Sequence, residues 1–368
     1  MWAMRIGMVC GYSLTIPGGV QGQVLGLARA LRAHGHDVRV LGPCDGAPPD
    51  GGIIPLGNTL PVEANGSIAA LAPDPAAQLR TIRALRDERF DVVNVHEPLT
   101  PGPCVTTLVV EEAPLVGTFH AAGTSSSYRW MGAPLRRIAN RLTARVAVSR
   151  DARTLAASTI HGHYEVLFNG VDVERFAKAS PWPTTRPTIL FIGRHEPRKG
   201  LAQLLSAVSG LRDDVAVWVA SDGPQTDELR QRFGGDARIE WLGRIPDAEK
   251  EARLAGADLF CAPSLGGESF GVVLLEAMAA GTAVVASDLP GYRTAARPDR
   301  EALLTPPGDV EALRRAIATV LARPALGADL VGAGELRAAS FSMDRLAERY
   351  LELFERSVRT RPRPAGSP

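Results

Sequence analysis

The sequence predicts an α/β protein in which two doubly wound, Rossmann-like domains follow one another along the chain. Short apolar runs that indicate strands alternate with amphipathic helices, and this alternation is typical of a parallel sheet covered by helices on both faces. The alternation stops at residues 177–187, a segment rich in Pro, Thr and Ser, and then begins again. A length of 368 residues also fits two domains.

Domain boundaries follow from this restart. We expect an N-terminal domain at residues 1–168 and a C-terminal domain at residues 169–342. A helix over residues 343–359 is expected to return to the first domain. The segment 360–368 is rich in Pro and Arg and is expected to be disordered.

The elements of the first domain follow from apolar runs and from the helical period. One helix carries Val24, Leu27, Ala28 and Leu31 on a single face. Strands are expected at residues 6–10, 37–41, 92–96, 115–120 and 144–149. Helices are expected at residues 20–34, 76–89, after Pro101, and at 135–142.

In the second domain the same pattern predicts five strands, at residues 188–192, 215–220, 238–242, 259–263 and 283–287. Helices are expected at residues 201–211, 227–233, 247–254, 271–280 and 310–321. Ligands of such sheets bind at the carboxyl ends of the strands. Two tandem domains are therefore expected to hold two substrates in a cleft between them.

Charge and composition exclude several classes. The formal net charge is +1, which gives no reason to expect nucleic acid as a partner. No His, Cys or Asp spacing suggests a metal cage. No Cys-x-x-Cys pair occurs, so we expect reduced, buried thiols in a cytoplasmic protein, at Cys10, Cys44, Cys104 and Cys261.

Neither a signal peptide nor a membrane span is expected. The apolar run at residues 4–10 is too short for a signal-peptide core with its cleavage site. The longest apolar stretch, residues 271–289, contains Glu276 and Gly281 and is a poor spanning helix. Peripheral contact with a membrane stays open.

Gly18 and Gly19 lie between the first strand and the first helix. Glycines there let backbone N–H groups approach a ligand oxygen, and a helix N-terminus favours negative charge. The alternative is a purely structural turn. The motif is not the G-x-G-x-x-G of dinucleotide-binding proteins, which argues against a dehydrogenase.

The segment Gly193-Arg-His-Glu-Pro-Arg-Lys-Gly200 follows the first strand of the second domain and contains three cations. A diphosphate leaving group needs fixed positive charge, and Arg194, Arg198 and Lys199 can supply it. The alternative is a solvated basic loop.

The segment Gly266-Gly-Glu-Ser-Phe-Gly271 leads into a helix that contains Glu276. An unpaired carboxylate in an otherwise apolar helix is costly, so Glu276 should have a partner, and ribose hydroxyls are suitable. Glu268 precedes the helix and can face a ligand. The alternative is that these carboxylates only complement the helix dipole.

His120 ends one strand of the first domain, and His96-Glu97-Pro98 ends the neighbouring strand. A single histidine is usually structural. At the carboxyl end of a strand, where ligands bind, a functional role for His120 is favoured.

Together these motifs resemble glycosyltransferase family 4, whose members have the GT-B fold, and in particular its actinobacterial phosphatidylinositol mannosyltransferases of the PimA type. The resemblance covers nearly the whole chain. It is densest in residues 7–24, 95–98, 118–120, 193–200 and 266–288.

This resemblance implies that the N-terminal domain binds the acceptor and that the C-terminal domain binds the nucleotide sugar. It also implies a role for each matching residue. It implies that Gly19 lies beside the donor phosphate, that Arg194, Arg198 and Lys199 hold the diphosphate, and that Glu268 binds a hydroxyl of the transferred sugar. His120 would contact the sugar near the reacting centre, Glu276 would bind the ribose, and Tyr12 and Gln21 would lie where donor and acceptor meet. Asn65 would lie on the acceptor side. Ser269, Phe270, Gly271 and Val272 would frame the sugar and phosphate, and the nucleotide would contact Ile245, Asp247 and Lys250.

The resemblance also implies the reaction. The enzyme would be a retaining glycosyltransferase that moves mannose from GDP-mannose to phosphatidyl-myo-inositol at the inner membrane face. No tightly bound cofactor is implied, and Mg²⁺ is a candidate stimulating ion. Arg80, Arg83, Arg86 and Arg89 form a stripe that, with residues 128–131, Arg136 and Arg137, could contact anionic lipid.

Departures from the family pattern keep alternatives open. Ala70 and Ala64 stand where the mannosyltransferases have an arginine and a tyrosine, which favours a family 4 enzyme with another nucleotide sugar or a soluble acceptor such as an inositol phosphate. A third hypothesis is an inactive nucleotide-sugar-binding protein, and a fourth is a GT-B epimerase. The retained cations and carboxylates argue against the third.

Overall fold

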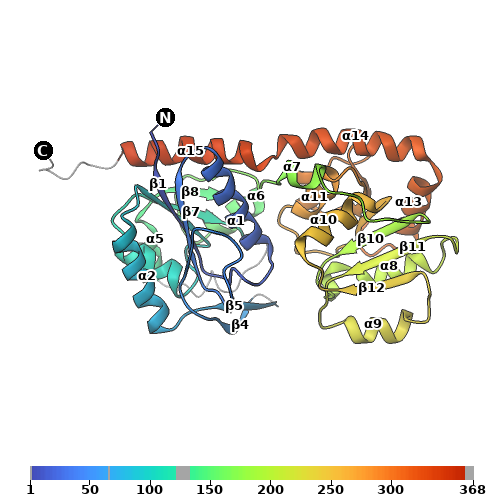
Figure 1. The fold of residues 1–368 in the computed structure, drawn as a ribbon, viewed down its shortest axis with the longest axis horizontal. Helices are drawn as coiled ribbons and strands as arrows, with labels where there is room; N and C mark the ends of the chain where they lie inside the picture. Colours follow the sequence, from blue (N-terminus) through green and yellow to red (C-terminus); the bar gives the residue numbers. More distant parts are fainter. Residues whose placement is uncertain (1, 65–66, 122–132, 361–368) are drawn as a thin grey trace, which may run out of the picture. The chain divides into compact units, whose positions relative to one another are not determined.

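The structure, a computed structural model, describes residues 2–64, 67–121 and 133–360 (Figure 1). It divides into two units. The first comprises Met1–Gly170 and Met343–Pro368, and the second comprises Val171–Ser342. Of the tail segment 360–368, which was expected to be disordered, Thr360 is described and its N–H donates to the Arg356 carbonyl oxygen over 3.1 Å. Residues 361–368 lie outside the described residues, as do Asn65 and residues 128–131.

The first unit is built on a seven-stranded sheet of order β3-β2-β1-β6-β7-β8-β9. All neighbouring strands are parallel, as expected for runs that are apolar on both faces. The strands are β1 (Arg5–Cys10), β2 (Asp37–Gly42), β3 (Ile53–Pro55), β6 (Val92–His96), β7 (Leu115–Phe119), β8 (Leu142–Ala147) and β9 (Glu165–Val166).

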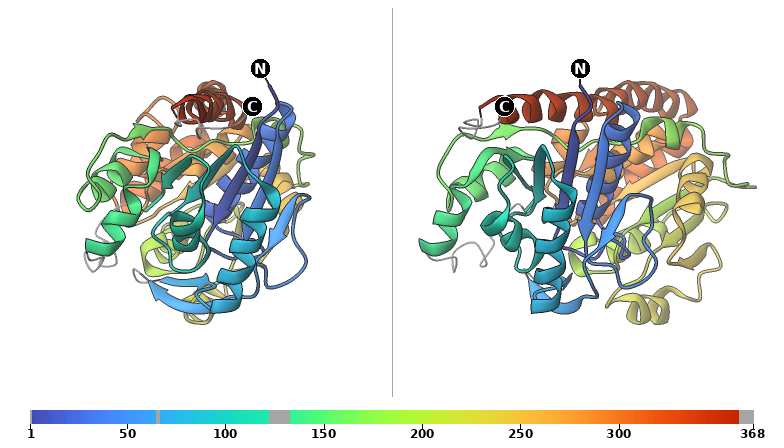
Figure 2. Two further views of the ribbon diagram at one scale, coloured as in Figure 1. Left: turned by 90° about the vertical axis from the view of Figure 1, so that its left-hand side faces the viewer. Right: turned by 60° about the vertical axis from the view of Figure 1, so that its left-hand side comes forward.

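Helices cover both faces of this sheet. On one face α1 (Gly19–Ala33) and α15 (Met343–Arg359) pack side by side (Figure 2). Their core includes Val92, Val116 and Val146 from the strands and Tyr350 and Phe354 from α15.

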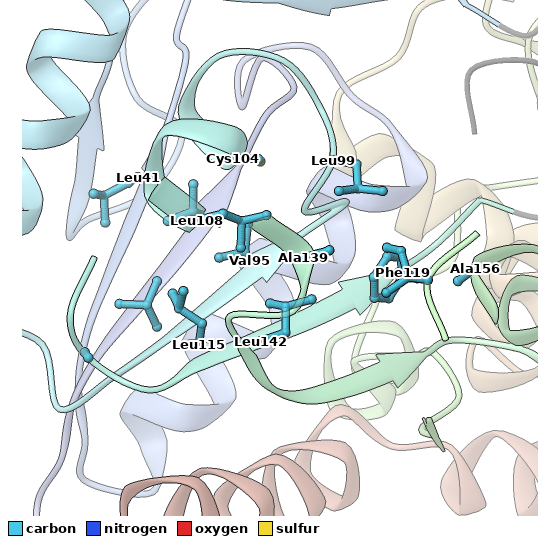
Figure 3. Close-up of a cluster of buried hydrophobic side chains, with 14 of the residues drawn as sticks. Leu41, Val95, Leu99, Cys104, Leu108, Leu115, Phe119, Ala139, Leu142 and Ala156 are labelled. Carbon is cyan, nitrogen blue, oxygen red and sulfur yellow. The ribbon is translucent and has the colours of Figure 1, made fainter. Parts of the chain in front are cut away.

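The other face is covered by α2 (Pro75–Glu88), α3 (Pro103–Val110), α5 (Ala133–Ala139) and α6 (Arg150–Ala157). Figure 3 shows this core, in which Val95, Leu115 and Phe119 of the sheet meet Leu108 of α3 and Ala156 of α6. Because successive strand residues point to opposite faces, Val95 and Phe119 lie on the face opposite to Asn94 and Thr118.

A small antiparallel hairpin lies outside the main sheet. Its strands are β4 (Leu60–Ala64) and β5 (Ser67–Leu71). The sequence analysis did not predict it, although Leu60, Val62 and Ala64 occupy alternate positions and Asn65-Gly66 is a sequence typical of hairpins. The hairpin contacts the loop after β1, where Ser13 N–H donates to the Ala70 carbonyl oxygen over 3.1 Å.

A six-stranded parallel sheet of order β12-β11-β10-β13-β14-β15 forms the second unit. Its strands are β10 (Thr188–Ile192), β11 (Ala216–Ala220), β12 (Ile239–Gly243), β13 (Leu259–Ala262), β14 (Ala283–Ser287) and β15 (Leu303–Thr305). Its helices are α7 (Val173–Ala177), the 3₁₀ turn η1 (Pro197–Lys199), α8 (Leu201–Val208), α9 (Thr226–Phe233), α10 (Asp247–Gly256), α11 (Val272–Ala279), α12 (Pro290–Ala295), α13 (Val310–Ala322) and α14 (Pro324–Ser340).

The two parallel sheets confirm the predicted fold class. The strands and helices that the sequence predicted in the second unit are present, with ends that differ by a few residues. Helix α14 was missed: Pro324 begins it directly after α13, and Gly327, Gly332 and Gly334 lie inside it, where glycine normally weakens a helix.

All four cysteines are buried and free of disulfides, as predicted. Within the described ranges, no single helix combines the length and the apolar content that a membrane crossing requires. The consecutive helices α13 and α14 meet that requirement only as a pair, and they are bent by 99° at their junction.

Candidate active site

Gly200 fixes the basic loop of the second unit. Its φ of +71° lies in the left-handed region, and a Cβ at this position would lie 1.9 Å from the Pro263 carbonyl oxygen. Only glycine tolerates both conditions. The loop therefore packs directly against the segment after β13, and Leu265 N–H donates to the Arg198 carbonyl oxygen over 2.7 Å.

This packing brings Lys199 to Glu268. The Lys199 Nζ lies 2.6 Å from Glu268 Oε1, and Ser264 Oγ donates to the same oxygen over 3.1 Å. Arg198 Nη1 lies 3.6 Å from it. The hydroxyl of buried Tyr292 lies 2.9 Å from Ser264 Oγ, and burial raises the pKa of this phenol above its usual range. Glu268 is thus held in one orientation by several polar partners.

Glycine also permits the position of the Glu268 backbone. A Cβ on Gly291, in α12, would lie 2.1 Å from the Glu268 carbonyl oxygen. Gly271, at φ +91°, begins α11, and a Cβ there would lie 2.6 Å from the Tyr292 ring. Two segments distant in sequence therefore approach each other at backbone distance around Glu268.

Arg194 and Arg198 share a single buried carboxylate. Glu196 Oε1 forms an ion pair with Arg194 Nε at 3.1 Å, and Glu196 Oε2 accepts from Arg198 Nε over 2.9 Å. Both arginine side chains stay nearly half exposed, at 47% and 43%. The basic loop and Glu268 together carry three cations and two carboxylates. They therefore present a net positive charge beside an exposed surface, as anion binding requires.

Glu276, in α11, pairs with Lys250, in α10. The distance between Lys250 Nζ and Glu276 Oε1 is 2.7 Å, and both side chains are largely buried. The sequence predicted a partner for Glu276 but not that Lys250 would supply it. A buried carboxylate that is already neutralised can still accept hydrogen bonds from hydroxyl groups at its second oxygen.

The other residues predicted to frame the donor lie near these pairs in the chain but differ in burial. Asp247 is 69% exposed and pairs with Arg175 over 3.0 Å. Ile245 is half-buried. Ser269 and Val272 are half-buried, whereas Phe270 and Gly271 are buried, and the Phe270 ring packs on Phe341 in an edge-to-face contact with a centroid distance of 5.5 Å.

In the first unit, Gly18 precedes α1 and no side chain caps the helix. Gly19 is exposed and has open space around it, so the first N–H groups of α1 are available to an anion. Gln21 does not point freely outward, because its Nε2 donates to the Ser13 carbonyl oxygen over 3.2 Å. Tyr12 is half-buried, and burial with the nearby Glu97 charge raises the pKa of its phenol.

His120 lies at the end of β7 in contact with His96, at the end of β6. The His120 Nε2 is 2.9 Å from His96 Nδ1, and the rings stack with centroids 5.2 Å apart. The backbone N–H groups of His120 and Ala121 donate to Glu97 Oε1 over 2.6 and 2.5 Å. Burial lowers the pKa of His120 to about 3 and the pKa of His96 well below its ordinary value, so both rings are neutral at pH 7.

These lowered pKa values predict an acid-sensitive first unit. Between pH 6.5 and pH 5.5 the unfolded chain binds protons at both histidines and the folded chain does not. The free energy of unfolding of the protein should therefore fall by about 1 kcal/mol per histidine as the pH is lowered from 6.5 to 5.5. Urea unfolding of the wild type and His120→Gln at both pH values measures this. The variant should lose less stability than the wild type, and exposed His161→Gln is the control; equal losses in the wild type and His120→Gln would contradict the prediction.

Several well-placed side chains were not singled out from the sequence: Asn94, Thr118, Glu196, Ser264, Tyr292 and Tyr350. A signal existed for two of them, because Asn94 with His96, and Thr118 with His120, repeat a polar residue at every second strand position. Within the described ranges, no three His, Cys, Asp or Glu side chains form a cluster suited to a metal ion.

Residues 17–175 match the family model Glycosyltransferase Family 4, and residues 186–323 match Glycosyl transferases group 1. The chain is 39% identical to the phosphatidyl-myo-inositol mannosyltransferase of Mycobacterium leprae over 96% of both chains. It is 38% identical to that of Mycolicibacterium smegmatis over 96% of this chain and 94% of the relative.

Solved structures share the fold at lower identity. The Anabaena protein Alr3699/HepE, solved with UDP and glucose, superposes with a TM-score of 0.75 at 19% identity, covering 96% of this chain and 100% of that chain. Together with the two parallel sheets, this similarity shows the GT-B fold that the sequence predicted.

Proposed function

Because the chain belongs to glycosyltransferase family 4, we propose that it transfers mannose from GDP-mannose to phosphatidyl-myo-inositol with retention of anomeric configuration. The transfer of a sugar follows from the family. The choice of donor and acceptor is supported by the identity of about 38–39% with two phosphatidyl-myo-inositol mannosyltransferases over nearly their full length.

The observation that carries the catalytic part of the proposal is the contact between Lys199 and Glu268 in a loop with two further cations. In the resting protein, two carboxylates neutralise these three cations only in part. A diphosphate can take over the contacts of Arg194 and Arg198, since both are exposed. Lys199 and Ser264 hold one oxygen of Glu268, and its second oxygen can accept from a sugar hydroxyl. The cations then stabilise the charge that develops on the leaving diphosphate, which is where such groups contribute most.

The proposed step conserves atoms and charge. The bond between the sugar C1 and the β-phosphate oxygen breaks, and its electron pair goes to that oxygen. The acceptor hydroxyl oxygen bonds to C1 on the same face, and its proton passes to the departing phosphate. Neutral His120 is not needed as a base in this scheme, and the carboxylate pair used by glycosidases is not required.

Glu276 and Lys250 are proposed to bind the nucleoside. Glu276 would accept from ribose hydroxyls while Lys250 keeps its charge neutralised, and Ile245 and Asp247 would lie beside the base. Gly19 at the start of α1 would contact the donor phosphate through backbone N–H groups. Tyr12 is proposed to contact the donor where donor and acceptor meet, and Gln21 and Asn65 are proposed to bind the acceptor.

We propose no tightly bound cofactor. EDTA-treated enzyme is expected to retain turnover, and added Mg²⁺ is expected to raise it by screening the diphosphate. Loss of all activity after EDTA treatment, with full recovery on Mg²⁺ addition, would contradict this part.

Peripheral attachment to the inner face of the cytoplasmic membrane is part of the proposal. Arg80, Arg83 and Arg86 on α2 and Arg89 directly after it are exposed, although Arg80 also donates to the Leu56 carbonyl oxygen and Arg83 pairs with Asp87. Arg136 and Arg137 are exposed as well. Vesicle flotation at low salt should show binding to phosphatidylinositol-containing vesicles, and its absence would remove this part of the proposal.

A soluble acceptor is the second candidate, and Ala70 favours it. This residue lies in β5, where the mannosyltransferase pattern has an arginine that could hold a lipid phosphate. A transfer assay with phosphatidylinositol vesicles and with inositol phosphate distinguishes the two acceptors.

Donor choice is tested by thermal unfolding with GDP, GDP-mannose, UDP and UDP-glucose. A ligand at about 100 times its Kd adds about 2.7 kcal/mol to the free energy of unfolding, so binding should be visible as a rise in Tm. We expect the guanosine compounds to stabilise and the uridine compounds not to. The reverse result would keep the family but replace the donor, and no effect from any compound would favour an inactive protein.

A further inference from the structure

A line of hydrogen-bonded polar side chains crosses the core of the first unit from α15 to His120. The Tyr350 hydroxyl lies 3.0 Å from Thr118 Oγ1, which lies 2.9 Å from Asn94 Oδ1. Asn94 Nδ2 is 3.1 Å from His96 Nε2, and His96 Nδ1 is 2.9 Å from His120 Nε2. All five side chains are buried, so no bulk water can exchange with these bonds.

With both histidines neutral, the protons along this line can run continuously in one of two directions. In the first order Tyr350 donates to Thr118, Thr118 donates to the Asn94 carbonyl oxygen, and the Asn94 amide donates to His96 Nε2. Neutral His96 then carries its proton on Nδ1 and donates to His120 Nε2. In the second order every bond is reversed and the Asn94 amide is turned over.

Asn94 decides between the two orders. Thr118 donates to its carbonyl oxygen over 2.9 Å, and its amide nitrogen lies 3.1 Å from His96 Nε2. An amide N–H₂ group can only donate, so His96 Nε2 accepts. Because Thr118 has a single hydroxyl proton and gives it to Asn94, the buried Tyr350 hydroxyl donates to Thr118.

The first order also settles what His120 presents. With its Nε2 accepting from His96, neutral His120 must carry its proton on Nδ1. Within the part of the chain that the structure describes, this nitrogen has no hydrogen-bond partner, whereas Nε2 and the backbone N–H are both engaged. His120 is therefore left with one free N–H donor.

We propose that His120 is fixed in its Nδ1–H tautomer by four positioning residues, Tyr350, Thr118, Asn94 and His96. His120 then offers the nucleotide sugar an N–H group and does not act as a base. The functional part rests on the proposed glycosyl transfer, in which an oxygen of the sugar or phosphate would accept this bond. The tautomer itself does not depend on that function.

The test is ¹⁵N NMR of the histidine rings in the full, ligand-free chain. The His120 signals can be assigned by their absence from the spectrum of His120→Gln. We expect one tautomer, protonated at Nδ1, with no change between pH 5.5 and 8. An Nε2–H tautomer, a mixture, or titration in this range would overturn the proposal.

The double variant Thr118→Val/Tyr350→Phe removes the hydroxyl that donates to the Asn94 carbonyl oxygen, together with the Tyr350 hydroxyl that donates to Thr118, and changes little else in shape. The two proton orders should then become similar in energy, so His120 should show both tautomers. With half of the free enzyme in the competent form, kcat/KM for the nucleotide sugar should fall about two-fold. An unchanged single Nδ1–H tautomer in this variant would overturn the role of Tyr350 and Thr118.

Tyr164→Phe is the matched control. The Tyr164 hydroxyl is also buried in the first unit but donates to the Ile160 carbonyl oxygen over 2.9 Å, away from the line. This control should keep the single tautomer, and a tautomer mixture in it would count against the proposal. If the tautomer results hold but no nucleotide sugar is turned over, the proposed function fails and the proton order stands.

Discussion

Lys199→Ala is expected to lower kcat by about 10²–10³-fold while the protein stays folded. Lys199 is the cation that contacts Glu268 at 2.6 Å, and loss of one group that stabilises developing charge typically has an effect of this size. Glu268→Ala should lower kcat by orders of magnitude as well, because the sugar hydroxyl loses its partner. Initial rates at saturating donor, with urea unfolding of each variant, measure both effects.

Lys178→Ala is the matched control for that experiment. Lys178 lies in the same unit and also pairs with a glutamate, Glu174, at 2.7 Å, but both side chains are exposed. Its removal should leave kcat unchanged. If Lys199→Ala kept near-normal kcat, the assignment of the basic loop to the leaving diphosphate would be wrong.

Gly200→Ala is expected to destabilise the second unit by more than about 3 kcal/mol and to abolish most activity. The left-handed φ of +71° costs a non-glycine residue about 1–2 kcal/mol, and the contact of 1.9 Å with the Pro263 carbonyl oxygen forces the loop to move. Lys199 would move with it. Urea unfolding and initial rates detect the two consequences.

Gly243→Ala separates the cost of the left-handed backbone from the cost of the contact with Pro263. Gly243 also has a positive φ, +65°, but a Cβ there would have nothing within 4 Å. The control should therefore cost only the backbone term, about 1–2 kcal/mol. Equal losses in the two variants would show that the packing of the loop against Pro263 contributes nothing.

The fold class was predictable because the strands of parallel sheets are apolar on both faces and the helices between them keep the helical period. Val24, Leu27 and Leu31 on α1 are buried as that period requires. Helix α14 was missed because it has no distinctive apolar period and contains three glycines, so its structure depends on what it packs against. The hairpin of β4 and β5 was missed although apolar residues at positions 60, 62 and 64 and the pair Asn65-Gly66 were an available signal.

The sequence predicted which residues belong to the candidate site but not which of them contact each other. Glycines next to cations and carboxylates indicated Lys199, Glu268 and Glu276, yet the contact between Lys199 and Glu268 spans 69 positions and depends on the packing of two loops. Tyr350 was beyond reach, since it meets Thr118 across 232 positions. Polar residues repeated on alternate positions of two buried strands were the available signal.

The return of α15 to the first unit also orders the events of biosynthesis. The core that α15 shares with α1 includes Ala347, Tyr350, Leu351 and Phe354, which the ribosome adds after the whole second unit. The second unit is one continuous segment and can fold as soon as it emerges. The first unit begins earlier but must wait with an open apolar face for the last helix, so the part of the chain that is made first is completed last.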